Sequence, residues 1–189
     1  KQRLPKSIEL TLVAFALAMP ISVMAGILAA VHKGTWIDSA VTGFVTMGIA
    51  VPPFWLGILL VILFSVKLDW LPSSGYVPFF EDPGGHIKIL IMPALTLAII
   101  LAAPAMRFLR SSMLEVMNQD YIRTAHAKGL KTRIVVYRHA MKNAMIPTVT
   151  FVGLQFASLL AGTILIEWVF GWTGLGFMII KAVLTQDYQ

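Results

Sequence analysis

The stretch that decides the fold is "LTLVAFALAMPISVMAGILAAV", residues 10–31, which has 22 residues and contains no Asp, Glu, Lys, Arg or His. A helix needs about 20 consecutive apolar residues to cross the hydrocarbon core of a bilayer. Three further runs that lack the same five residue types have spanning length, namely residues 39–66, 89–106 and 143–166. We therefore predict an all-α protein, a polytopic membrane helical bundle with four spans.

The composition supports a bilayer as the solvent of this chain. Of its 189 residues, 58% are hydrophobic and 13% are charged, whereas soluble domains carry about 25% charged residues. We place the expected spans at about 8–31, 43–66, 88–109 and 146–166.

The two ends of the chain lead to separate expectations. The apolar run 168–180 is too short to cross, so residues 167–189 are predicted to form an external interfacial segment. We read the "GWTGLG" within it, residues 171–176, as a tight turn at the membrane surface. The sequence begins at Lys1 and stops without a closing helix. We therefore expect the middle of a longer protein, truncated at both ends.

The positive charge is concentrated in one segment. The formal net charge is +6, and residues 107–145 hold eight Lys or Arg against two acids, so the rest of the chain sums to zero. Loops rich in Lys and Arg lie on the cytoplasmic side of a membrane. We therefore predict a cytoplasmic loop over residues 110–145. By alternation, residues 32–39 are cytoplasmic as well, and the loop 67–88 is external.

This basic loop has a helical pattern. Residues 112–128 contain no Gly or Pro, which predicts one helix that ends at Gly129 in the left-handed conformation. Thr132 is predicted to cap a second helix. At 100° per residue, the apolar arc of that helix comprises Ile134, Val136, Tyr137, Ala140, Met141, Ala144 and Met145, with Val135 and Arg133 as exceptions. Such a helix pair indicates a docking surface for a partner, although a basic loop can also serve topology alone or bind anionic lipid.

Residues 120–147, "DYIRTAHAKGLKTRIVVYRHAMKNAMIP", resemble the peptide and nickel subfamily of the permease subunits of bacterial ABC importers. The family signature is Glu-Ala-Ala, three residues, Gly, and then Ile-x-Leu-Pro. Arg123 stands in its Glu slot, Thr124 and Ala125 in its Ala slots, and Gly129 at its Gly. The stretches "PPFWLG", "LDWLPSSG", "MPALTLA" and "VFGWTGLG" also look like this subfamily and occur in the expected order. The resemblance therefore covers essentially the whole chain.

The resemblance implies a type I ABC importer permease, a multi-pass protein of the bacterial inner membrane. It implies a non-catalytic subunit without a cofactor, which imports di- or oligopeptides and pairs with a second homologous permease subunit, two ATP-binding subunits and an external substrate-binding protein. Nickel chelates and glutathione are carried by systems with the same subunit type. The basic loop would couple the spans to the ATPases through Tyr121, Arg123, Thr124, Ala125, Lys128, Gly129, Arg138 and His139.

Other chemistry finds little support in the sequence. It contains no G-x-x-x-x-G-K-[ST], H-E-x-x-H or G-x-S-x-G motif, so we expect no phosphate-binding loop, no metalloprotease site and no nucleophile elbow. We expect no metal site and no nucleic-acid partner. The four long runs contain no acid, which disfavours a proton- or sodium-driven carrier. The alternative functions are a channel or secondary carrier whose basic loop binds lipid and, less favoured, a membrane-embedded enzyme.

Overall fold

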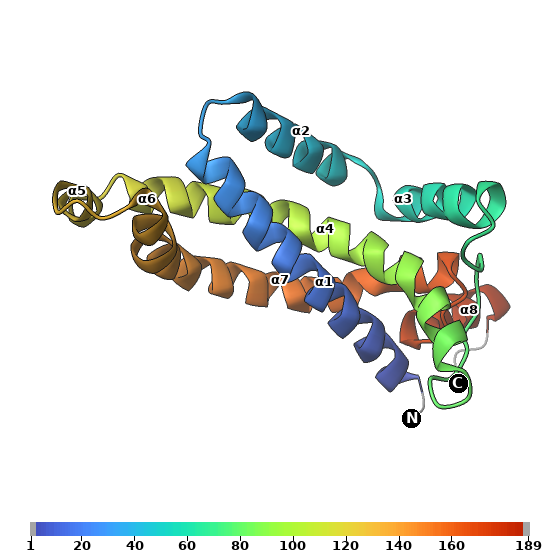
Figure 1. Ribbon diagram of the computed structural model, residues 1–189. Helices are drawn as coiled ribbons and strands as arrows, with labels where there is room; N and C mark the ends of the chain where they lie inside the picture. Colours follow the sequence, from blue (N-terminus) through green and yellow to red (C-terminus); the bar gives the residue numbers. More distant parts are fainter. Residues whose placement is uncertain (1–2, 187–189) are drawn as a thin grey trace. The chain divides into compact units, whose positions relative to one another are not determined.

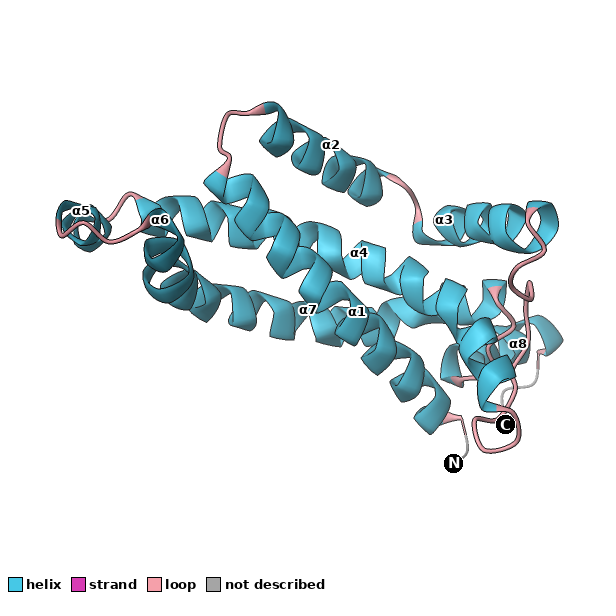
Figure 2. Cartoon of the chain, viewed as in Figure 1, coloured by secondary structure: helices cyan, strands magenta, loops and turns pink. Residues whose placement is uncertain are grey.

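The computed structural model describes residues 3–186, and within this range every regular element is helical (Figures 1 and 2). The all-α prediction is therefore confirmed for the described residues. In chain order the elements are α1 (Leu4–Val31), α2 (Trp36–Ala50), α3 (Pro53–Leu60), the π-helix η1 (Val61–Lys67), α4 (Pro83–Met117), α5 (Asp120–Ala127), α6 (Thr132–Ile134), the π-helix η2 (Val135–Ala140), α7 (Met141–Val169) and α8 (Leu175–Thr185).

Within residues 3–186, two helices, α1 and α4, are each long and apolar enough to cross a membrane. The number rises to four if two bent helix pairs each form one span, namely Trp36–Ala50 with Pro53–Lys67, and Thr132–Leu159 with Gly162–Val169. Within the expected span 43–66 the helix is interrupted, because Pro52 has φ −58° and ψ 137°, and α3 begins at the next residue. Proline lacks the backbone N–H that a continuing helix would require.

The chain divides into two compact units. The first contains the residues up to Ala18, Val51–Leu101 and the residues from Phe156 onward. The second contains Met19–Ala50 and Ala102–Gln155. The expected coupling loop, residues 110–145, lies entirely in the second unit. Of the expected external segment, residues 187–189 lie outside the described part of the chain.

In the first unit, a buried carboxylate holds the turn between α7 and α8. Glu167 has no exposed surface, and its Oε1 accepts a hydrogen bond from Ser7 Oγ at 2.5 Å. Its Oε2 accepts a second bond from the backbone N–H of Phe177 at 3.1 Å. Gly171 has φ +61°, and a side chain at Gly174 would collide with Glu167 and Ser7. The "GWTGLG" stretch therefore forms the tight turn that its glycines predict.

Aromatic rings pack close to this turn, in the same unit. Tyr76 and Trp172 meet edge to face, with ring centroids 4.9 Å apart, and Lys6 Nζ lies 3.7 Å from the centre of the Tyr76 ring. His86 is buried, and its Nε2 lies 3.0 Å from Glu9 Oε1. Burial raises the pKa of the Tyr76 hydroxyl, and the nearby Glu9 carboxylate adds to the shift. These contacts join the start of α1 to the loop that precedes α4 and to the first turn of α4.

In the second unit, small residues let the helices approach closely. A side chain at Gly26 would lie about 3.1 Å from Leu109, so α1 and α4 pack here with no room between them. Ala29 and Ala103 are buried in a cluster with Met106. Small residues at such positions allow the close packing by which helices associate in a membrane. This packing supports the end of α4 from which the candidate functional site extends.

Candidate functional site

The basic loop is built on an apolar cluster at the ends of α4 and α7. Ile122 and Ala125 of α5 are buried in this cluster, with 3% and 7% of their surfaces exposed. The remaining buried members come from α1, α4, η2 and α7, and they are Ile27, Ala30, Leu109, Met113, Val135, Val136, Ala140 and Ala144. Burial of apolar side chains is the main force that fixes a short helix, because eight residues alone are too few for a stable helix in water.

A backbone turn sets the direction in which the chain leaves α5. The N–H of Gly129 bonds to the carbonyl of His126 at 2.9 Å, and the N–H of Leu130 bonds to the carbonyl of Ala125 at 3.3 Å. This pair of bonds is a Schellman motif, which satisfies carbonyls at the end of a helix. Gly129 has φ +77°, and a Cβ there would meet nothing within 4 Å. The prediction that Gly129 ends a helix in the left-handed conformation is confirmed, and this preference for glycine rests on backbone conformation alone.

Most of α5 presents polar side chains to the outside. Tyr121, Arg123, Thr124 and Lys128 are all exposed. The Tyr121 hydroxyl accepts a hydrogen bond from Asn143 Nδ2 at 2.7 Å, which ties α5 to the first turn of α7. The buried apolar side chains on one side of α5 and this hydrogen bond on the other hold its polar surface in place. We call the exposed residues Tyr121, Arg123, Thr124 and Lys128 the α5 face.

The sequence predicted one continuous helix over residues 112–128, but the structure has two helices there. α4 ends at Met117, and α5 begins at Asp120. Gln119 between them is extended, with φ −73° and ψ 149°. The prediction was wrong because it relied on the absence of Gly and Pro, whereas an Asn such as Asn118 also favours helix ends. Thr132 is likewise the first residue of α6 and not its cap, which is Lys131 and makes no side-chain bond.

The predicted apolar arc of the second helix is wrong at several positions. Val135, expected as an exception, is buried, whereas Ile134 and Tyr137 are exposed by 40% and 51%. The cause is the π-helix η2, in which hydrogen bonds run from residue i to i+5 and the helix is underwound. A period of 100° per residue therefore does not describe this segment.

The exposed side of η2 is hollowed. Arg133, Ile134, Tyr137, Arg138 and Lys142 line a hollow of about 490 Å³. Three of these five side chains are basic and none is acidic. Arg138, one of the residues implied by the resemblance, lies in this hollow and not on the α5 face. His139 is partly exposed on the same π-helix.

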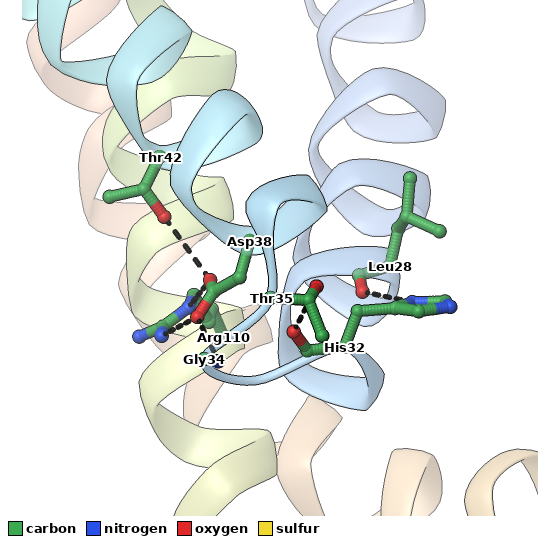
Figure 3. Close-up of polar contacts among 7 residues, drawn as sticks. All are labelled: Leu28, His32, Gly34, Thr35, Asp38, Thr42 and Arg110. Carbon is green, nitrogen blue, oxygen red and sulfur yellow. Dashed lines mark hydrogen bonds and ion pairs between the residues drawn. The ribbon is translucent and has the colours of Figure 1, made fainter.

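An ion pair that sequence reasoning missed joins α2 to α4 in the same unit (Figure 3). Arg110 Nε lies 2.7 Å from Asp38 Oδ1, and Arg110 Nη2 lies 2.7 Å from Asp38 Oδ2. The Asp38 carboxylate also accepts bonds from the Gly34 N–H at 3.0 Å and from Thr42 Oγ1 at 3.3 Å. The partners are 72 residues apart, so no local pattern could have paired them. The pair braces the end of α4 that carries α5.

The structure thus divides the eight residues implied by the resemblance into four groups, the last of which is the buried Ala125. Tyr121, Arg123, Thr124 and Lys128 form the α5 face, and Gly129 forms the turn after it. Arg138 and His139 lie on η2. The expectation that Ala125 contributes to an exposed surface needs correction, because its side chain is buried among the apolar anchors.

Comparisons with known proteins agree on one family. Residues 22–189 match the family described as binding-protein-dependent transport system inner membrane component. The chain is 45% identical over 186 residues to a putative peptide transport system permease protein of Brucella abortus (strain 2308), covering 98% of the chain and 59% of that protein. It is 42% identical over 186 residues to the glutathione transport system permease protein of Escherichia coli (strain K12), covering 98% and 58%.

A solved structure shows the same fold. The crystal structure of an amino acid ABC transporter with histidines superposes with a TM-score of 0.71 at 14% identity, covering 98% of this chain and 78% of that one. The chain spans less than two thirds of the length of the curated relatives above. The family match nevertheless extends over most of the chain, residues 22–189. This chain belongs to the family of binding-protein-dependent transport system inner membrane components.

Proposed function

We propose that this chain is the transmembrane permease part of an ATP-driven importer and that its α5 face receives the cytoplasmic ATPase. The observation that carries the proposal is the way α5 is mounted. Two buried anchors, a hydrogen bond from Asn143 and the Schellman turn fix the helix, while its polar side stays exposed. A surface held in this way can transmit a push to α4 and α7, because packed helices move as rigid elements.

The proposal includes a topology. Residues 110–145 lie in the cytoplasm, and the segment from residue 167 onward is external, with four spans near 8–31, 43–66, 88–109 and 146–166. The basic character of residues 107–145 supports this orientation. In this topology each of the two bent helix pairs would form one span.

Peptides are the proposed substrate class. The relatives named above are a putative peptide transport permease and a glutathione transport permease, and glutathione is itself a small peptide. The partners would be a second permease subunit, two ATP-binding subunits and an external binding protein. ATP hydrolysis would take place in the separate subunits, because this sequence has no phosphate-binding loop of the P-loop kind.

A charge reversal on the α5 face tests the proposal. The variant Arg123→Glu in the full-length protein should lose association with the ATPase subunit and lose peptide uptake, because reversal places an acid where a cation meets the partner. Lys33→Glu is the matched control, since Lys33 is also exposed in the second unit and undergoes the same change in charge. Copurification of the ATPase with both variants to the same extent would contradict a contact at α5.

A further inference from the structure

The hollow beside η2 collects positive charge that the α5 face does not use. Arg133, Arg138 and Lys142 line it together with the ring of Tyr137 and the side chain of Ile134. These basic residues are separated by five and four positions. In an α-helix with 3.6 residues per turn, Arg133 and Arg138 would lie about 140° apart, on different sides. Arg133 lies in α6 directly before η2, Arg138 lies in η2 and Lys142 lies in the first turn of α7. The wider turn of the π-helix brings residues five apart towards one side, which helps to gather these basic side chains around one hollow.

The same side of the helix becomes apolar further along α7. Ile146 and Val149 follow Lys142 and have 68% and 60% of their surfaces exposed. Exposed apolar side chains on a membrane helix are suited to hydrocarbon, and Arg, Lys and Tyr gather where such a face reaches the water. Long basic side chains at this depth extend towards the polar headgroups. The hollow would therefore lie at the level of a membrane interface, next to the span proposed near residues 146–166.

We propose that this hollow binds the headgroup of an anionic phospholipid, such as phosphatidylglycerol. Arg133, Arg138 and Lys142 would contact the phosphate and the negative charge of the headgroup. Tyr137 would lie at the level of the glycerol backbone, and Ile146 and Val149 would contact an acyl chain. The inference requires only the membrane location of the family and does not depend on transport activity or on the ATPase.

The test measures lipid preference in reconstituted vesicles. The full-length protein is reconstituted in vesicles of phosphatidylcholine that contain a trace of one spin-labelled lipid at a time, either phosphatidylglycerol or phosphatidylcholine. The fraction of immobilised label gives the relative affinity of each lipid. Wild-type protein should prefer phosphatidylglycerol, and Arg138→Gln/Lys142→Gln should reduce this preference by about fivefold per base removed. The matched control is Arg123→Gln/Lys128→Gln, which removes the same charge from the α5 face and should leave the lipid preference unchanged.

Each remaining outcome also decides the matter. An equal loss of preference in both double variants would show a general effect of net charge and would overturn the site. Competition by inorganic phosphate at low millimolar concentration, with no discrimination between the two lipids, would show a site for free phosphate instead. Displacement of phosphatidylglycerol when the ATPase subunit is added would make the hollow a protein contact. Loss of ATPase association in the Arg123→Gln/Lys128→Gln control alone, with lipid preference intact, would support both proposals separately.

Discussion

The ion pair between Asp38 and Arg110 yields the most quantitative prediction. In Asp38→Asn the side chain keeps its volume but loses its charge, and an amide NH₂ replaces one of the two oxygens that accept from the guanidinium. One of the two 2.7 Å contacts then becomes a contact between two donors. Arg110 keeps its charge beside a neutral partner, in a position where 25% of its side chain is exposed.

The exposure of the pair sets the expected magnitude. Removing one partner of a fully buried ion pair costs about 3–5 kcal/mol, whereas exposed pairs contribute about 0–1 kcal/mol. The side chain of Asp38 is 9% exposed and that of Arg110 is 25% exposed, which places this pair between the two cases. We therefore expect a loss of about 2–3 kcal/mol of stability. For a protein of this size class that corresponds to a fall in Tm of about 5–10 °C.

Thermal unfolding of the purified full-length protein in detergent measures this effect. A double-mutant cycle with Asp38→Asn, Arg110→Gln and the double variant isolates the interaction between the two side chains. The stability lost in the double variant should be about 2 kcal/mol smaller than the sum of the losses in the two single variants. The control is Asp120→Asn, because Asp120 pairs with Arg123 at 3.4 Å with both side chains largely exposed. Its Tm should change by less than about 2 °C. A coupling energy near zero, or equal shifts in Asp38→Asn and the control, would refute the reasoning.

Three further predictions concern the basic loop and its topology. At Gly129, φ is +77° and no neighbour lies within 4 Å of a Cβ, so Gly129→Asn should leave the stability of the turn nearly unchanged, whereas Gly129→Val should lower it by about 1–2 kcal/mol. ATPase association should therefore fall in the order Gly, Asn, Val while membrane levels stay normal. Equal association of all three proteins would remove the turn from the mechanism. Ile122→Ala should lower the stability of the fold by about 2–5 kcal/mol and loosen α5 from its apolar cluster. Backbone hydrogen exchange over residues 120–127 should then be faster, and unchanged exchange would mean that Ile122 does not anchor the helix. A single cysteine at Ser74 should react with an impermeant thiol reagent in intact cells and one at Thr132 should not, and the reverse pattern would invert the proposed topology.

The signals that succeeded in the sequence are local. Uncharged runs of spanning length predict helices because a bilayer leaves the backbone few alternatives. A glycine after a stretch without Gly or Pro predicts the end of a helix, and Gly129 does terminate α5 with positive φ. The family resemblance also rests on local motifs, and the match over residues 22–189 confirms it.

The features that sequence reasoning missed depend on winding or on distant contacts. The π-helix η2 changes the period of the helix, so a face derived at 100° per residue assigned Ile134, Val135 and Tyr137 to the wrong sides. Asp38 and Arg110 meet only because α2 and α4 pack together in the folded second unit. The ion pair carries no signal in a single sequence, because it arises from tertiary packing, and a period of 100° per residue assumes a regular α-helix where η2 forms.

The most direct test of the central claim is a crosslink between the α5 face and the ATPase. Thr124 is exposed on α5, and this chain contains no cysteine, so Thr124→Cys introduces a defined attachment point in a full-length protein freed of any other cysteines. Paired with single cysteines on the ATPase surface, it should form a crosslink whose yield changes when ATP is added, whereas Lys33→Cys should not. A yield at Thr124→Cys no higher than at Lys33→Cys, with and without ATP, would contradict the account.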